Sequence, residues 1–322
     1  MPCFSPLKGY KDPNTGGIMF RRPSVANPEP MDVACYQCLG CRRDRQRHWA
    51  IRILLHSLQF DQNIFVTLTY RDEWRCNDEQ RRNGWFLPRD GSVNLAHFQG
   101  FMKRLRKKFP ERKISYFHCG EYGEENFRPH YHACIFNLEM PDRVLYKNTA
   151  TGPLWRSDLL DSLWRYGYCA YGDVEFNSAA YCASYTLKKV TGLIAEDYYR
   201  RIDLDDGHVY WIEPEYATMS NGLAESWLKE YLGDVFPSDE VPVPGKGVLK
   251  GVPRYFTEKL KEFDESLHEQ VKMARQDFIN EHCEDFTAYR LLDKGVVAKA
   301  RQRFYEEKRA TADSLERFSV YG

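Results

Sequence analysis

Several features that would place this sequence in a class at once are missing from it. No stretch approaches the roughly eighteen consecutive apolar residues of a membrane-spanning helix, and the N-terminus has no basic-then-apolar signal region. A G-x4-G-K-[ST] phosphate loop is also missing, so we expect no motor driven by the chain's own ATP hydrolysis. Hydrophobic residues make up 43% of the 322 residues, which is ordinary for a globular protein. We therefore expect a folded cytoplasmic protein with no membrane partner.

The chain also lacks a net charge, but this neutrality hides an uneven distribution. In total, 46 basic residues balance 46 acidic ones. Residues 1–200 hold 29 basic and 22 acidic residues, whereas residues 201–322 hold 17 basic and 24 acidic ones. This asymmetry predicts a polyanion-binding front portion joined to an acidic portion with another task.

The ten cysteines do not form the pattern of a disulfide framework, and we expect reduced thiols. Three of them form the cluster Cys35-x2-Cys38-x2-Cys41, and Cys3 could add a fourth sulfur to a structural zinc site. Because a second local Cys-x2-Cys pair is missing, the spacing favours unligated thiols over zinc, and both over an iron–sulfur cluster.

Periodicity and composition predict an α+β fold. Helical spacing of apolar residues covers about 42–60, 95–109, 156–167 and 177–189, whereas strand-like runs cover 63–70, 113–121, 130–136 and 168–175. Residues 1–34 and 71–92 resemble loops, 209–219 a further strand, 235–254 a Pro/Gly-rich connector and 256–309 long helices. This order predicts an antiparallel sheet of about five strands covered by helices, with a helical C-terminal extension.

Four segments follow from this organisation. They are an N-terminal segment with the cysteines and the first helix (1–60), a core (61–200), a connector with additional core elements (201–255) and an acidic helical tail (256–322).

A histidine pair in one predicted strand suggests a metal site. His130 and His132 are two residues apart, so in a strand both side chains point to the same face and can bind one divalent ion. Glu121 ends the preceding strand, which we expect to pair antiparallel across the turn at 122–129. The carboxylate would then complete the site if the turn sets that register.

Two tyrosines follow at helical spacing. Tyr181 and Tyr185 are i and i+4 neighbours, and Lys188 lies on nearly the same face. Such a pair is often an aromatic core stripe, but a phenol beside a cation is also a competent nucleophile. A metal that polarises a phosphodiester while the phenol attacks in line would give a 5′-phosphotyrosyl DNA and a free 3′-hydroxyl.

Basic residues gather around these motifs as candidate phosphate contacts, although each could equally lie on a solvated helix face. The aromatic residues Tyr70, Trp74 and Tyr116 could stack on unpaired bases. The candidate DNA-binding residues are Arg42, Arg43, Lys103, Arg104, Arg106, Lys107, Lys108, Arg128 and Lys189.

Three motifs in this order resemble those of a known family. They are Phe-Val-Thr-Leu-Thr-Tyr at 65–70, Arg-Pro-His-Tyr-His at 128–132 and Tyr-x3-Tyr-x2-Lys at 181–188. The set resembles replication initiators of the HUH endonuclease superfamily, closest to those of gokushovirus-type Microviridae. The resemblance implies a rolling-circle nickase whose HUH core, ferredoxin-like in fold, spans 61–200.

The same resemblance implies roles for individual residues, and it also implies the partners and the cellular location of the protein. His130, His132 and Glu121 would hold Mg²⁺ or Mn²⁺, and Tyr181 and Tyr185 would be the nucleophiles. The partners would be the single-stranded replication origin, a host helicase and a host DNA polymerase, in the cytoplasm of a bacterial host.

Three alternatives explain parts of the pattern. A cupin-like metal enzyme also uses His-x-His, but its glutamate follows closely, whereas the first acid after His132 is Glu139. A conjugative relaxase-like nickase usually carries its nucleophile before the histidines. A non-catalytic DNA-binding protein explains the basic residues but gives the metal and tyrosine motifs no role.

Overall fold

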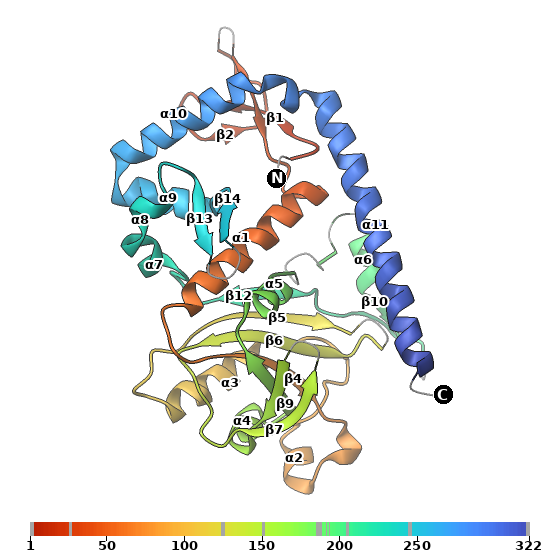
Figure 1. Ribbon diagram of the computed structural model, residues 1–322. Helices are drawn as coiled ribbons and strands as arrows, with labels where there is room; N and C mark the ends of the chain where they lie inside the picture. Colours follow the sequence, from red (N-terminus) through yellow and green to blue (C-terminus); the bar gives the residue numbers. More distant parts are fainter. Residues whose placement is uncertain are drawn as a thin grey trace. The chain divides into compact units, whose positions relative to one another are not determined.

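In the computed structural model, one antiparallel sheet of seven strands carries the fold (Figure 1). Its order is β12-β5-β6-β4-β9-β8-β7. The strands are β4 (Asn63–Tyr70), β5 (Ser115–Tyr122), β6 (Pro129–Phe136), β7 (Val144–Thr149), β8 (Gly152–Arg156), β9 (Gly167–Asp173) and β12 (Tyr216–Met219). The predicted α+β class is confirmed, and the sheet has two strands more than the roughly five expected.

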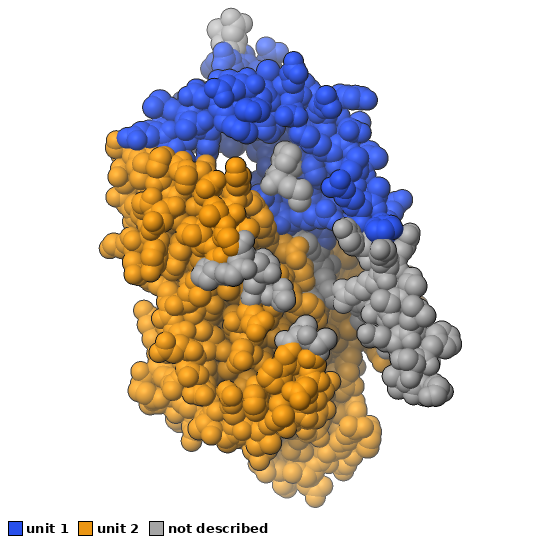
Figure 2. All heavy atoms as spheres, viewed as in Figure 1, with its two compact units in different colours: residues 1–45, 269–322 blue, residues 46–268 orange. Residues whose placement is uncertain are grey.

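The structure describes residues 3–25, 28–123, 126–149, 152–184, 189–190, 192, 194–203, 206–243 and 247–319. The chain divides into two compact units (Figure 2): unit 1 comprises residues 1–45 and 269–322, and unit 2 comprises residues 46–268. The predicted boundaries at residues 60, 200 and 255 stay predictions. Within the described ranges, each helix is too short or too polar to cross a membrane.

The helices fall into short connectors, sheet-packing helices and long C-terminal ones. They are α1 (Leu39–Ser57), α2 (Asp78–Arg82), α3 (Leu95–Lys108), α4 (Asp158–Trp164), α5 (Phe176–Ser184), α6 (Ala195–Tyr199), α7 (Glu225–Glu230), α8 (Leu232–Val235), α9 (Arg254–Phe263), α10 (Glu265–Glu281) and α11 (Ala288–Ser319), with 3₁₀ turns η1 (Glu73–Arg75) and η3 (Cys283–Phe286).

Helices cover both faces of the sheet, because its strands alternate. The side chains of β4 are alternately half-buried and buried along its whole length. On one face, α3 and α4 supply Phe101 and Trp164 to a core with the even-numbered residues of β4. On the other face, α1 and α5 supply Ile53 and Ala183 to a second core. Each face of β6 therefore has its own set of neighbours.

Two segments that the sequence analysis took for loops contain regular structure. Residues 1–34 include a three-stranded sheet of β1 (Leu7–Lys11), β2 (Ile18–Met19) and β3 (Pro30–Val33), whose strands are short and mostly exposed. Residues 71–92 include η1 and α2, and a capping box between Asn77 and Gln80 caps the N-terminus of α2. The connector and its surroundings form two hairpins: β10 (Arg200–Ile202) with β11 (Val209–Trp211), and β13 (Glu240–Val243) with β14 (Gly247–Lys250).

One buried histidine, His56, and one half-buried histidine, His97, predict a stability that depends on pH. Burial lowers the pKa of His56 and of His97 from 6.5 to about 4, so both are neutral in the folded chain at pH 7. The His56 ring lies 2.8 Å from Ser115 Oγ through Nε2 and accepts the Ala224 N–H at 3.2 Å through Nδ1. Below pH 6.5 the unfolded chain binds protons at these sites and the folded chain does not.

We therefore expect the free energy of unfolding to fall by about 1–2 kcal/mol per histidine between pH 7 and pH 5. Urea unfolding at the two pH values measures this loss. His56→Gln keeps an acceptor but cannot titrate, so the variant should lose less stability than the parent chain. Equal losses in the two chains would show that His56 is not responsible.

Candidate active site

Strand register brings the predicted metal ligands together. Glu121 on β5 is the direct cross-strand partner of His130 on β6, as the turn at 122–129 was expected to arrange. Glu121 Oε1 lies 2.7 Å from His130 Nε2 and 3.0 Å from His132 Nε2. The ligand atoms of the three residues lie within 4.8 Å of one another. Two imidazole nitrogens and a carboxylate oxygen thus converge on one point.

The two histidine rings are held by their other nitrogen. His130 Nδ1 lies 3.1 Å from the Arg128 carbonyl oxygen, which can only accept, so Nδ1 carries the proton and donates. His132 Nδ1 lies 3.0 Å from Thr67 Oγ1 on β4. In a neutral His130, the lone pair of Nε2 then faces a carboxylate oxygen. A divalent cation between them would turn this repulsion into coordination, so the donor set fits such an ion.

Tyr131, which lies between the two histidines in β6, anchors the strand through contacts on the opposite face of the sheet. Tyr131 is fully buried on the α3 face, where its hydroxyl accepts the Asn94 N–H at 2.7 Å and contacts Tyr70 at 2.7 Å. Burial raises the pKa of Tyr131 to about 12, so the phenol stays neutral. Because β6 alternates, this anchor fixes both histidines on the α5 face.

Helix α5 places Tyr181 beside the metal ligands. The Tyr181 ring lies 5.4 Å from the His132 ring and 6.0 Å from Phe65, both in edge-on contact. The side chain is 44% exposed, which leaves it accessible to a large substrate. Tyr181 also lines a pocket of about 420 Å³ with Phe65, Leu154 and Ser178. Tyr185 and Lys188, predicted from the same motif, lie outside the described residues.

Three of the scattered cysteines meet under the site. Cys119, Cys134 and Cys182 are fully buried between the sheet, α1 and α5. Burial raises the pKa of Cys119 and Cys134 well above that of a free thiol, so they stay protonated and unreactive. We assign Cys119 and Cys134 a packing role beneath His132.

The basic residues of α3 lie on the other side of the sheet. Because α3 packs on the face of the sheet opposite α5, the basic residues of α3 do not lie beside His130 and His132. Arg104 is half-buried and donates to the Leu163 carbonyl at 2.7 Å, and Arg106 donates to the Ile114 carbonyl at 3.2 Å. Lys103, Lys107 and Lys108 are exposed.

The remaining predicted DNA contacts differ in their surroundings. Arg128 forms an ion pair with Asp72 at 2.7 Å and donates to the Tyr70 carbonyl, so it ties β6 to the end of β4. Arg42 and Lys189 are exposed, and Arg43 is half-buried.

The three aromatic residues proposed to stack on bases also differ. Tyr70 is 3% exposed, so its predicted role as a platform for bases is wrong; the ring belongs to the core. Tyr116 is half-buried against Phe98. Trp74 is 70% exposed and remains a candidate.

One exposed aromatic residue near the site was missed by the sequence analysis. Tyr168 on β9 pairs with Thr69, which in turn pairs with His130, so all three point to the α5 face in one row across the sheet. The ring is 39% exposed, with the guanidinium carbons of Arg71 and Arg156 at 5.3 and 5.7 Å from its centroid. No local sequence motif predicts that Tyr168 lies near the site, because its position depends on the pairing of β4 with β9.

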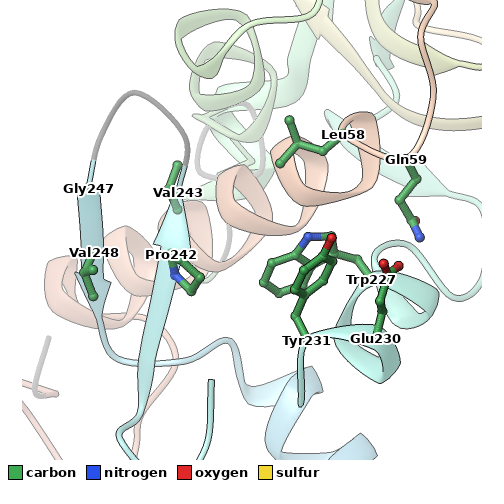
Figure 3. Close-up of a pocket in the computed structure, with 9 residues that line it drawn as sticks. All are labelled: Leu58, Gln59, Trp227, Glu230, Tyr231, Pro242, Val243, Gly247 and Val248. Carbon is green, nitrogen blue, oxygen red and sulfur yellow. The ribbon is translucent and has the colours of Figure 1, made fainter. Parts of the chain in front are cut away.

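A larger pocket lies elsewhere in unit 2 (Figure 3). It measures about 810 Å³ and is lined by Leu58 and Gln59 directly after α1, by residues of α7 and by the β13–β14 hairpin. The ring of Tyr231, directly after α7, stacks on Trp227 at 5.0 Å. None of the site residues predicted from the sequence is among the residues that line it. The pocket is therefore separate from the candidate active site.

Comparison with known proteins gives a consistent set of relatives. The family model for "Replication-associated protein ORF2/G2P" matches residues 63–190, which include Glu121, both histidines and Tyr181. The chain is 30% identical to replication-associated protein ORF2 of Spiroplasma virus 4, over 92% of this chain and 90% of that protein. It is 28% identical to replication-associated protein VP4 of Bdellovibrio phage phiMH2K, over 90% and 89%. It is 26% identical to replication-associated protein ORF4 of Chlamydia phage 1, over 71% and 53%. No solved structure matches the chain.

Proposed function

Because this chain belongs to the family of phage replication-associated proteins, we propose that it starts rolling-circle replication by nicking the single-stranded origin. The observation that carries the proposal is the convergence of Glu121, His130 and His132 on one point, with the Tyr181 ring 5.4 Å from His132. A metal site beside an accessible phenol suits phosphodiester cleavage and has no evident use in a protein that only binds DNA. The sheet ends at β12 and β7 instead of closing, so a cupin-like barrel is not favoured.

Each residue of the candidate site has one role in the proposed reaction. Glu121, His130 and His132 would hold Mg²⁺ or Mn²⁺, which when bound polarises the scissile phosphate and offsets its developing charge. The Tyr181 oxygen attacks the phosphorus and the P–O bond to the 3′ oxygen breaks, which leaves a 5′-phosphotyrosyl link and a free 3′-hydroxyl. The phenolic proton is lost to solvent, and the departing 3′ oxygen takes up a proton from solvent. Tyr185 would serve the second transfer, which rejoins the strand without ATP.

The test is formation of a covalent adduct. The full chain is incubated with a labelled origin strand and Mn²⁺ or Mg²⁺, and the adduct is isolated under denaturing conditions. Peptide mass spectrometry should place the DNA on the segment containing residues 181 and 185. Cleavage without an adduct, or an adduct on another residue, would contradict the tyrosine mechanism.

Tyr168 and its two arginines supply a path for the unpaired strand on the same face. A base stacked on the exposed ring would lie between two cations that neutralise its flanking phosphates. The basic residues of α3 would then contact DNA only where the DNA strand passes to the other side of the sheet.

Host helicase and host polymerase remain proposed partners, acting in the host cell.

We expect Tyr168→Ala to weaken binding of a short origin oligonucleotide by about 10-fold, since base–aromatic stacking contributes roughly 1–3 kcal/mol. Fluorescence anisotropy at fixed salt measures the change. Tyr231→Ala, at an exposed aromatic in the separate pocket, is the matched control and should bind normally. A larger effect from Lys107→Ala on α3 than from Tyr168→Ala would move the DNA path to the opposite face.

A further inference from the structure

Four cysteine sulfurs meet in unit 1, at the start of α1. The Sγ atoms of Cys3, Cys35, Cys38 and Cys41 all lie within 4.8 Å of one another. Cys3 Sγ is 3.5 Å from Cys35 Sγ and 3.8 Å from Cys38 Sγ. Two zinc–sulfur bonds of about 2.3 Å at a tetrahedral angle separate their sulfurs by about 3.8 Å. The observed spacing therefore matches a metal tetrad, and it is too long for a disulfide bond of about 2.05 Å.

Backbone amides point at these sulfurs. The amides of Phe4 and Cys41 donate to Cys38 Sγ, at 3.3 and 3.5 Å. Those of Cys35 and Cys38 donate to Cys3 Sγ and Cys35 Sγ, each at 3.3 Å. A neutral thiol is a weak acceptor, whereas a metal-bound thiolate is a strong one. The backbone is thus already folded around acceptor sulfurs.

The segment between the first two cysteines lacks a core of its own. In β1, β2 and β3, Gly9 is the one buried residue. Apolar side chains that could have formed a core are exposed: Leu7 at 46%, Ile18 at 57%, Phe20 at 60% and Met31 at 42%. A sheet this small cannot be stable through burial, and segments of this kind usually depend on a bound metal or a disulfide.

We propose that Cys3, Cys35, Cys38 and Cys41 bind one structural Zn²⁺ ion. All four donors are sulfur, which suits zinc and not the oxygen-seeking Mg²⁺ or Mn²⁺ of the active site. The four thiol protons leave to solvent, and the resulting charge of minus two is offset by the first turns of α1 and its arginines, Arg42, Arg43 and Arg45. The spacing of the cysteines along the sequence favoured unligated thiols over zinc, whereas the distances between their sulfur atoms favour zinc.

Zinc in this place would fasten three parts of unit 1. Cys3 precedes the small sheet, Cys35 follows it, and Cys41 lies in the first turn of α1. Next to Cys3, Phe4 packs on Gly295 of α11, where an added Cβ would lie 3.2 Å from the Phe4 side chain. One ion would therefore hold both ends of the sheet to α1, and through Phe4 to α11.

The test measures metal content and thiol protection in the full chain. Mass spectrometry of the purified protein should find about one Zn²⁺ per chain that survives mild chelation. Cys38→Ser and Cys41→Ser should lose it. Cys283→Ser, at an exposed cysteine outside the cluster, and His130→Ala, at the other candidate metal site, should both retain it.

A second measurement does not depend on how the variants fold. Stripping the metal from the native chain with a strong chelator should free four additional thiols for a thiol reagent. It should also speed tryptic cleavage after Lys8 and Lys11 by about 10-fold or more, reversed by adding Zn²⁺. Absence of zinc, iron in its place, or unchanged zinc content in Cys38→Ser would overturn the proposal. Because the nicking assay is not used, this outcome is independent of the proposed function.

Discussion

A chain carrying Tyr181→Phe is expected to lose the first cleavage of the origin strand, and the double variant with Tyr185→Phe to lose both cleavage and joining, by at least about 10³-fold. The substitution removes only the oxygen that would attack phosphorus. The ring would keep its contacts with His132 and Phe65, and the side chain is 44% exposed, so folding should not change. DNA affinity should stay within about 2-fold, because one hydroxyl contributes little to phosphate contacts.

The measurements are adduct formation on denaturing gels and joining of a labelled acceptor strand. Tyr146→Phe removes a hydroxyl from a tyrosine that is 50% exposed in the same unit, and it should cleave and join normally. If the double variant cleaved and joined like the parent chain, neither tyrosine could be the nucleophile.

Glu121→Gln is expected to reduce metal-dependent cleavage by at least about 100-fold at limiting Mn²⁺. Even outer-shell partners of metal ligands change affinity or activity by about 10–100-fold, and Glu121 would bind the ion directly. The change keeps the shape of the side chain and removes the negative charge between the two histidines, whose Nε2 atoms lie 2.7 and 3.0 Å from Glu121 Oε1. His130→Ala should act in the same direction.

The matched control is Glu215→Gln. This glutamate is also buried, at 3% exposed, but it binds the Tyr199 hydroxyl and lies outside the metal-ligand group. It should cost stability without changing the dependence of cleavage on Mn²⁺. Raising the Mn²⁺ concentration should partly restore Glu121→Gln. Full activity of the parent chain in the presence of a chelator would remove the metal from the mechanism.

The sequence predicted best what is determined locally. The run at 63–70 is rich in β-branched and aromatic residues, and it forms β4 at those bounds. The register of Glu121 against His130 followed from two strands joined by one short turn, where few pairings are possible. The helical spacing at 95–109 likewise forms α3, whose buried side chains are Phe98, Phe101, Met102 and Leu105.

What the sequence could not supply depends on distant pairing. Tyr168 reaches the active-site face only because β9 pairs with β4, almost a hundred residues earlier in the chain. Cys3 was named from the sequence as a possible fourth sulfur, but its position beside the other three depends on the path of the chain through an intervening sheet with no apolar pattern. The hairpin of β7 and β8 was missed for a related reason, since its exposed residues show no clear alternation. Helix α2 did leave a signal, the Asn77-x-x-Gln80 spacing of a capping box.

The alternation of β6 has a consequence for the proposed nicking activity. Tyr131 sits in the core between two histidines that must face the opposite side. If the strand paired one residue out of register, both imidazoles would face the α3 side and the phenol would face the α5 side, so the three ligands could not meet. Misregistered copies would therefore lack the proposed nicking activity, because the register that stabilises the sheet also assembles the candidate metal site.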